Sequence, residues 1–342
     1  RTLVDNLDEY IHIPGGIDRL KKTILHLAVS GQLVPQIPAE GTGEELYKQI
    51  QAEKNKTTTK NKQLPDITEE EKPFEIPDSW RWTRVSDLGS ALGQKKPDND
   101  FYYIDVSSIN NIAKTLKQPA LVAAKDAPSR ARKVVKEGTV IYSTVRPYLL
   151  NTTIIHNTFD KELIASTAFA ILHPFVGVIS EWLLFNLISQ YFTDYTNNKS
   201  VGASYPAIND AQFSMAIMPL PPTSEQKRIV EKVNVIFALI DDLSKKYQAE
   251  QAERKKLVKS ALAQLARGNG ELALIHLGEI IRTKAEAAEL RKSILHLAVS
   301  GQLVPQIPAE GTGTDLYKQI QAEKQKLIAQ GKLKKQKPLP VI

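Results

Sequence analysis

ILHLAVSGQLVPQIPAEGTG occupies Ile24–Gly43, and the same letters return at Ile294–Gly313. The match widens to Leu20–Lys54 and Leu290–Lys324, which we call the first copy and the second copy and which differ at four positions. A repeat of short period predicts a solenoid, in which each unit stacks on its neighbour. Two distant copies with unrelated sequence between them instead predict pseudo-symmetry, with two equivalent surfaces for two equivalent partners.

The bulk composition narrows the class of protein. A chain of 342 residues allows one large core or two to three smaller units. The absence of cysteine excludes disulfides, thiolate nucleophiles and cysteine-ligated zinc. No apolar run approaches the ~20 residues of a membrane helix and no secretory signal opens the sequence, so we expect a cytoplasmic protein without a membrane partner. The net charge of +7 favours a polyanionic partner such as nucleic acid.

The sequence predicts helices in both copies and a longer helix between the α/β region and the second copy. Apolar residues at spacings of three and four predict an amphipathic helix that ends near Gly31, with its stripe at Ile17, Leu20, Ile24 and Leu27. A longer helix begins at Thr223 or Ser224 and stops at Gly268. Its heptad seam requires a partner helix, for which the copies are the candidates; the seam runs through Ile229, Val233, Ile236, Ile240, Leu243 and Tyr247.

Between the first copy and the long helix the sequence predicts a mixed α/β domain. Its candidate strands are rich in β-branched and aromatic residues and comprise Tyr102–Val106, Thr139–Ser143, Thr152–Ile155 and Ala168–Leu172. Glu181–Tyr195 has helical spacing. The expected organisation is a helical region over 1–55, a linker over 56–79, the α/β domain over 80–221, the long helix over 222–268, and a second helical region over 269–342.

Four stretches together carry a resemblance to a known family. They are SILHLAVSGQLVPQ followed by AEGTG and LYKQIQAEK in the second copy, IPDSWRWTRVSDLG at Ile76–Gly89, ARKVVKEGTVIYSTVRPYL at Ala131–Leu149, and LPPTSEQKRIVEKV at Leu220–Val233. With this order of parts, the chain resembles the DNA specificity (S) subunit of type I restriction–modification systems. The usual member of that family carries two target recognition domains, whereas this sequence shows one.

The resemblance implies a fold and a set of partners. A globular α/β target recognition domain would read one half of a split double-stranded DNA target, and the conserved helices would pair as a long antiparallel coiled coil. Methyltransferase (modification) subunits would dock on this framework, and a separate restriction subunit would supply the translocase and nuclease. As a spacer, a helix of about 65–70 Å spans at most about 20 base pairs.

Catalytic signatures are missing from the sequence. No GxGxxG, Walker A or HExxH pattern occurs, and the six histidines show no ligand spacing. The Asn/Asp-Pro-Pro-aromatic pattern of amino-methyltransferases is also absent. We therefore expect a non-catalytic recognition subunit, with no catalytic, cofactor-binding or metal-binding residue of its own.

The candidate DNA contacts gather in and around Ser129–Asn151 and in the loop after Asn198. Arginine can pair with guanine or hold a phosphate, while hydroxyl and amide side chains do either job more weakly. Arg146, at a strand end, is the strongest candidate; for the basic run before that strand a merely solvated face fits equally well. The full set is Lys95, Lys96, Arg130, Arg132, Lys133, Ser143, Thr144, Arg146, Tyr148, Asn151, Lys199, Ser200, Ser204 and Tyr205.

Because the sequence shows one recognition domain, two forms stay open. Pro338-Leu339-Pro340 follows the second copy as Gln63-Leu64-Pro65 follows the first, so the chain stops where a second domain would begin. It is either a half-length subunit that forms a head-to-tail homodimer through its helices, or part of a two-domain subunit. Two other functions also remain: the recognition portion of a single-chain restriction–methylation enzyme, and a coiled-coil protein-interaction module.

Overall fold

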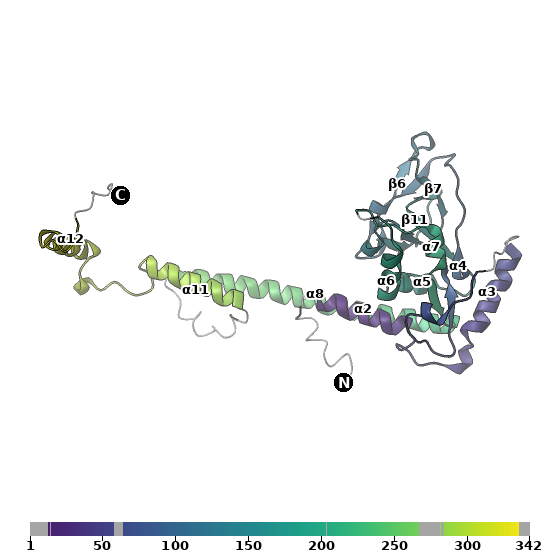
Figure 1. Cartoon of the computed structure of the whole chain (residues 1–342), viewed down its shortest axis with the longest axis horizontal. Coiled ribbons are helices and arrows are strands. Elements are labelled where there is room, and N and C mark those ends of the chain that lie inside the picture. Colours follow the sequence, from purple (N-terminus) through teal and green to yellow (C-terminus); the bar gives the residue numbers. More distant parts are fainter. Residues whose placement is uncertain are drawn as a thin grey trace. The chain divides into compact units, whose positions relative to one another are not determined.

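The computed structural model describes residues 13, 15–57, 64–202, 204–266, 281 and 284–334. The chain divides into two compact units, Arg1–Ser244 and Lys245–Ile342 (Figure 1). Helix α8, Thr223–Ala266, contributes residues to both units and agrees closely with the predicted long helix. Within the described ranges, no helix is both long and apolar enough to cross a membrane.

In the first unit, helix α2 (Gly16–Val29) packs antiparallel to the start of α8. Lys21 Nζ lies 2.5 Å from Asp241 Oδ1, whereas Gln36, further along the chain, donates to Glu225 at 2.7 Å. As the first chain segment advances, the second therefore runs backward. Leu20 and Ile24 of the predicted stripe and Ile229, Val233 and Ile240 of the predicted seam are buried in one cluster. The same cluster includes Leu25, Ala28 and Val29, which the stripe did not select. The predicted antiparallel pairing is present for the first copy.

The mixed α/β domain follows, built from short strands. One four-stranded sheet has the order β6-β3-β10-β7, and another has the order β2-β11-β8-β9. Strand β10 is parallel to β3 and antiparallel to β7, so the first sheet is mixed. The strands of the two sheets are β2 (Gly89–Ser90), β3 (Phe101–Ile104), β6 (Ala120–Val122), β7 (Ala131–Val135), β8 (Val140–Ser143), β9 (Thr152–Ile154), β10 (Leu163–Ser166) and β11 (Phe169–Pro174).

Two further strand pairs complete the domain. Strand β1 (Arg81–Arg84) pairs antiparallel with β12 (Ile217–Leu220), which joins the domain's entry to its exit. The hairpin of β4 (Ile109–Asn110) and β5 (Thr115–Leu116) stands apart from both sheets in the strand pairing. The four strands predicted from sequence correspond to β3, β8, β9 and β11, whereas the remaining strands were not predicted.

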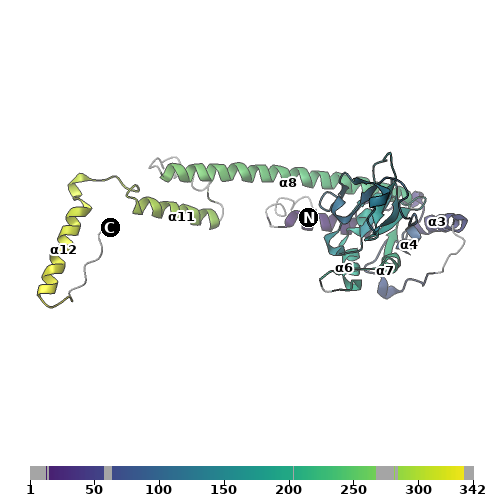
Figure 2. The same cartoon turned by 90° about the horizontal axis from the view of Figure 1, so that it is seen from above.

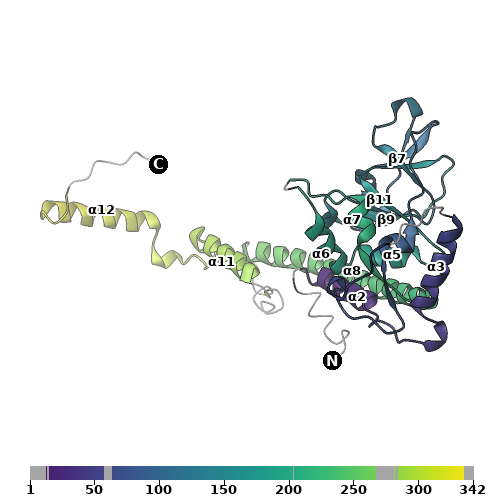
Figure 3. The same cartoon turned by 45° about the vertical axis from the view of Figure 1, so that its right-hand side comes forward.

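Helix α5 connects this domain to the pair formed by α2 and the start of α8. Helix α5 (Ser180–Leu187) contacts β8 and β9 on one side and α2 on the other (Figure 3). On α5, Trp182 packs edge-on against Trp80 at 5.5 Å and donates from its indole to the Pro219 carbonyl at 3.1 Å. The predicted single helix over Glu181–Tyr195 is in fact two helices, because Ser189 caps a new one. The domain's remaining helices are α4 (Val85–Leu88), α6 (Gln190–Lys199) and α7 (Asp210–Met215).

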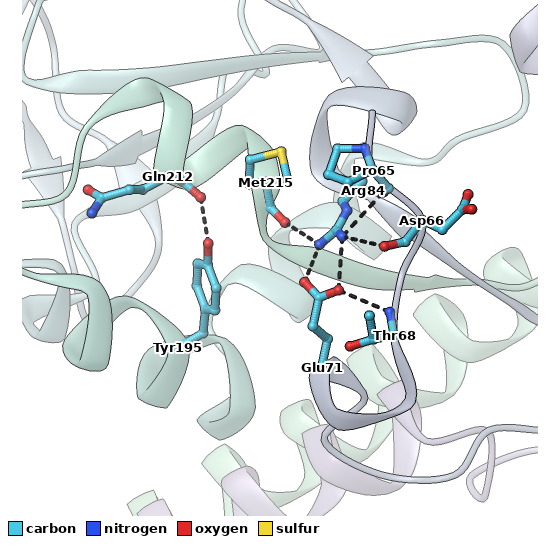
Figure 4. Close-up of polar contacts among 8 residues, drawn as sticks. All are labelled: Pro65, Asp66, Thr68, Glu71, Arg84, Tyr195, Gln212 and Met215. Atoms are coloured by element: carbon cyan, nitrogen blue, oxygen red, sulfur yellow. Dashed lines mark hydrogen bonds and ion pairs between the residues drawn. The ribbon is translucent and has the colours of Figure 1, made fainter. Parts of the chain in front are cut away.

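The first copy continues into α3 (Gly43–Thr57), and the segment after it is held to the domain by a buried arginine. Figure 4 shows the Arg84 guanidinium facing Glu71, with nitrogen–oxygen distances of 2.6 and 3.0 Å. Arg84 also donates to the Met215 carbonyl at 2.9 Å. The Arg84 hydrogen bonds hold the pKa of the Glu71 carboxyl below its usual range. The part of the predicted linker that the structure describes is thus anchored to β1.

The second unit contains the rest of α8 with α11 (Lys284–Val299) and α12 (Gly313–Ala329). Helix α11 lies beside the end of α8 (Figure 2), and Arg254 pairs with Glu286 at 2.9 Å. Leu297 is the buried residue of α11. Helix α11 is described from Lys284 onward, and residues 267–280 and 282–283 lie outside the described part of the chain.

Candidate nucleic-acid interface

Three chain segments meet where strands β8 and β10 end. The Thr144 amide donates to the Ala168 carbonyl at 2.8 Å, and the Arg146 amide donates to the Pro206 carbonyl at 2.7 Å. An isolated bridge also joins Val145 to Ala207. We call residues 143–151, 167–168 and 198–207 the recognition edge, leaving aside Ala203, which lies outside the described residues. Segments far apart in sequence are therefore held together by backbone hydrogen bonds.

Arg146 occupies the centre of this edge in an unusual conformation. Its backbone is left-handed, with φ of 49°, which costs a non-glycine residue free energy unless the surroundings hold it. The guanidinium lies 4.2 Å from the centroid of the exposed Tyr205 ring, a cation–π arrangement. Its Nε is buried and has no hydrogen-bond partner among the described residues. A stacked, pre-oriented guanidinium suits guanine or phosphate recognition.

Several other predicted contact residues lie on the same edge. Tyr148 is exposed on the short 3₁₀ helix Pro147–Leu149 that Arg146 precedes. Lys199 is exposed at the end of α6, where its carbonyl accepts a bond from Gln212 at 3.2 Å. The predicted residues that the recognition edge brings together with accessible side chains are Arg146, Tyr148, Asn151, Lys199, Ser200, Ser204 and Tyr205.

Three predicted contacts require correction because their side chains are buried and already bonded. Ser143 donates to the Val145 carbonyl at 2.8 Å, and Thr144 donates to the Ala168 carbonyl at 3.0 Å. Lys133 donates to Asp210 at 2.5 Å and to the Phe169 carbonyl at 2.6 Å. Sequence could not show this burial, because it depends on how strands pair. Ser143 and Thr144 therefore support the edge from within, whereas Lys133 is held at β7 by bonds to residues outside the edge.

The remaining predicted basic residues lie around the start of β7. The Lys95 amide donates to the Arg132 carbonyl at 2.9 Å, which brings the two predicted stretches together. The Lys95 ammonium, however, pairs with Glu162 at 2.8 Å and Asp98 at 3.0 Å, and these hydrogen bonds raise its pKa. Arg130 is exposed and its carbonyl accepts the Thr167 amide at 2.8 Å, so it adjoins the recognition edge. Lys96 is exposed as well.

Sequence reasoning missed the β4–β5 hairpin. Asn111 donates to the Leu149 carbonyl at 3.0 Å, and Lys114 donates to the Leu150 carbonyl at 2.7 Å. Burial lowers the pKa of the Lys114 ammonium to about 8. A signal was available in the charges: residues 106–125, 138–159 and 195–209 contain no aspartate or glutamate, and they supply both the hairpin and most of the edge.

These features define a class of site. The edge offers stacked aromatic and guanidinium groups and exposed amines and amides, and its own residues include no carboxylate, which suits an anionic ligand with flat faces. Within the ranges the structure describes, no group of histidine, aspartate and glutamate side chains is arranged to hold a metal ion. The fold and the edge together suit a domain that binds nucleic acid and is mounted on paired helices.

Comparisons with known proteins give the family. The family model described as "Type I restriction modification DNA specificity domain" matches residues 77–253, more than half of the chain. The chain therefore belongs to that family, which is one of recognition and not of catalysis. The match covers the α/β domain and the first part of α8, and both copies lie outside it.

Individual relatives agree with this assignment. The Escherichia coli type I restriction enzyme EcoAI specificity subunit is 30% identical over 96% of this chain and 59% of the relative, and the EcoEI specificity subunit is 28% identical over 96% and 58%. The crystal structure of the HsdS subunit from Thermoanaerobacter tengcongensis is 32% identical, with a TM-score of 0.50 over 56% of this chain and 50% of that one. The chain thus spans less than two thirds of these relatives.

Proposed function

We propose that this chain is the specificity component of a type I restriction–modification complex in the cytoplasm. Its α/β domain reads one half of a bipartite double-stranded DNA target, and its helices carry the methyltransferase (modification) subunits and the restriction subunit. The observation that carries the DNA-reading role is Arg146, which is strained, stacked on Tyr205 and central to an edge without carboxylates. The relatives' names, all specificity subunits, favour this function over a single-chain enzyme.

Arg146 provides the direct test of DNA reading. Methylation-site sequencing in a host that carries the chain with its modification subunit identifies the target, and filter binding to that duplex then measures affinity. Arg146→Ala should weaken binding by about 1–3 kcal/mol and reduce the slope of affinity against salt. Lys161→Ala, a change of an exposed residue outside the edge, is the control. Equal affinity for wild type and Arg146→Ala would contradict the assignment.

The second copy supports a proposal about assembly, namely that it receives a second recognition domain. In the first copy, Leu46 and Ile50 are buried in the core of the α/β domain, whereas their counterparts Leu316 and Ile320 are exposed. A second chain's domain already packs on its own first copy. A head-to-tail homodimer through the helices would therefore form by exchange, with the second copy of one chain replacing the first copy of its partner.

A single glycine pair tests this assembly. A Cβ at Gly43 would collide with the carbonyl oxygen of Leu220, whereas a Cβ at its counterpart Gly313 meets nothing within 4 Å. If a recognition domain docks on the second copy in the same way, Gly313→Ala should abolish the dimer and leave the monomer folded. Lys318→Ala, on the same helix, is the control. Light scattering that finds only monomer at tens of micromolar for the wild type would contradict the homodimer.

A further inference from the structure

The tip of the β4–β5 hairpin presents an apolar side chain to solvent. Ile112 is 91% exposed, the highest value for a large apolar side chain in the described part of the first unit. The turn that carries it is fixed, because the Asn110 side-chain oxygen accepts the amides of Ile112 at 3.2 Å and Ala113 at 3.1 Å. A single exposed isoleucine is ordinary, but a rigid turn that presents it next to other exposed apolar side chains is typical of a binding surface.

Three hydrogen bonds fix this hairpin to the recognition edge and to β9. The side chains of Asn111 and Lys114 donate to consecutive carbonyls, those of Leu149 and Leu150, at 3.0 and 2.7 Å. In return, Thr153 on β9 donates to the Lys114 carbonyl at 2.6 Å. The hairpin pairs with neither sheet, so these side-chain bonds, together with the packing of Ile109 and Leu116 in the domain core, set its position relative to Arg146.

Backbone strain marks the same junction. Among the described residues, the non-glycine residues with positive φ are Lys114 at 55°, Arg146 at 49° and Leu150 at 51°. The Lys114 side chain donates a hydrogen bond to the Leu150 carbonyl. Arg146 and Leu150 flank the two ends of the short helix Pro147–Leu149. Left-handed backbone at such residues persists where the surroundings hold it firmly, and it gathers at functional sites.

The surroundings of the tip identify the chemistry of the partner. Exposed apolar and aromatic side chains accompany it on the edge, namely Tyr148, Leu149, Val201 and Tyr205. The segments that carry them have lysines and an arginine but no aspartate or glutamate. Segments that combine exposed apolar side chains with cations and contain no carboxylate of their own complement the faces and phosphates of DNA better than they complement a protein of mixed charge.

We propose that the β4–β5 hairpin is a second DNA-reading element, in which Ile112 makes an apolar contact with the bases. Lys114 is a positioning residue that fixes the hairpin to the strand end carrying Arg146. The inference rests on the proposed DNA-reading function and deepens it. An isoleucine reads DNA by contact with a thymine methyl group or by insertion between base pairs, and both act without releasing counterions.

Base preference and the salt dependence of affinity distinguish the role of Ile112 from that of Arg146. The assembled complex with its modification subunits selects from a pool of duplexes carrying a randomised segment. Ile112→Ala should bind the wild-type consensus about tenfold more weakly and lose the preference at one or two base positions, while its salt slope stays unchanged. Val176→Ala, which alters an exposed valine outside the edge, should match the wild type in both readouts.

Lys114 is tested together with Asn111, since each ties the hairpin to the edge by one bond. Lys114→Met and Asn111→Ala should each relax the base preference that Ile112→Ala removes, and the double change with Ile112→Ala should add little. Circular dichroism and the melting temperature establish that each variant is folded. A pool that yields no consensus with the wild type refutes DNA reading altogether. A wild-type consensus that Ile112→Ala binds with equal preference and affinity overturns the hairpin alone.

Discussion

The first copy buries most of its apolar side chains in the first unit, whereas the second copy leaves most of their counterparts exposed and buries Leu297. Leu25 is 5% exposed and its counterpart Leu295 is 59% exposed. His26 and its counterpart His296 are both exposed, although the His26 ring also packs edge-on against Phe74 at 5.5 Å. The two copies differ at four positions, none of them apolar, so the difference in burial lies in what the rest of the chain supplies to each copy.

Local structure, in contrast, is the same in both copies. Gly41 and Gly311 have φ of 83° and 85°, where a side chain would be strained. The internal hydrogen bond between Gln36 and the Gly31 carbonyl recurs between Gln306 and the Gly301 carbonyl, at 3.3 and 3.2 Å. Turns, caps and helix ends are therefore encoded locally, while the buried face of each copy is a surface that needs a partner domain.

The largest contrast should come from the apolar face. Ile50 is fully buried and Ile320 is 52% exposed, although they occupy equivalent positions. Ile50→Ala should lower the free energy of unfolding by about 4 kcal/mol, because it leaves a cavity in the core. Ile320→Ala should change it by less than about 0.5 kcal/mol. Urea denaturation of the isolated chain measures both, and equal losses would remove the distinction between the copies.

The next contrast is between the space available for a side chain at Gly43 and at its counterpart Gly313. Gly43→Ala would force the backbone of α3 away from Leu220, and we expect a loss of about 3 kcal/mol from this overpacking. Gly313→Ala should leave the monomer intact, since its added methyl meets nothing. Thermal melts of both variants at a concentration below any association check this. A large loss in Gly313→Ala monomers would show that the second copy is already occupied.

An ion pair gives a smaller contrast. Arg228 on α8 holds Glu40 with nitrogen–oxygen distances of 2.9 and 2.6 Å, while the counterpart Glu310 is exposed. Glu40→Ala should cost about 1.5 kcal/mol, because it removes a charge-assisted pair that is partly shielded from water. Glu310→Ala should cost nothing measurable. Double-mutant cycles with Arg228→Ala would isolate the pairwise free energy at the first copy.

The smallest effect should be a pH dependence of the folding stability, caused by Glu225, whose carboxyl accepts a hydrogen bond from Gln36 of the first copy. Burial raises the pKa of the Glu225 carboxyl above its ordinary value. The folded state then binds a proton more tightly than the unfolded state, so stability from this group is greatest at acid pH and falls as pH rises through the raised pKa. Glu225→Gln should therefore stabilise the protein at pH 7, and the gain should shrink toward pH 4.5. A gain independent of pH would argue against this cause.

The predictability of the fold follows how local its determinants are. The seam through Ile229 and Val233 and the stripe through Leu20 and Ile24 predicted the helical pair, because helix periodicity is written in neighbouring residues. The β4–β5 hairpin escaped prediction, since strands of two residues are too short to show alternation. Ser189 split one predicted helix into two by capping α6, which spacing alone does not reveal.

The candidate site was predictable only in part. Arg146 and Tyr205 were both selected for their chemistry, and their stacking contact depends on a loop pairing that the sequence does not announce. Lys133 looked like a surface cation but is buried beside Asp210, because strand pairing decides which side of β7 it occupies. Ile112 was overlooked because an exposed isoleucine has no polar signature.

The ion pair between Arg84 and Glu71 limits where such a chain can be spliced to another. Glu71 precedes the segment that matches the family, which begins at Pro77, whereas Arg84 lies within it. A chimaera spliced at Pro77 would take its cation from one parent and its anion from the other. A domain that carries Arg84, joined to an upstream segment that lacks Glu71, would contain a buried guanidinium with no counter-charge, at a cost of about 3–5 kcal/mol. Grafts should therefore start upstream of Glu71.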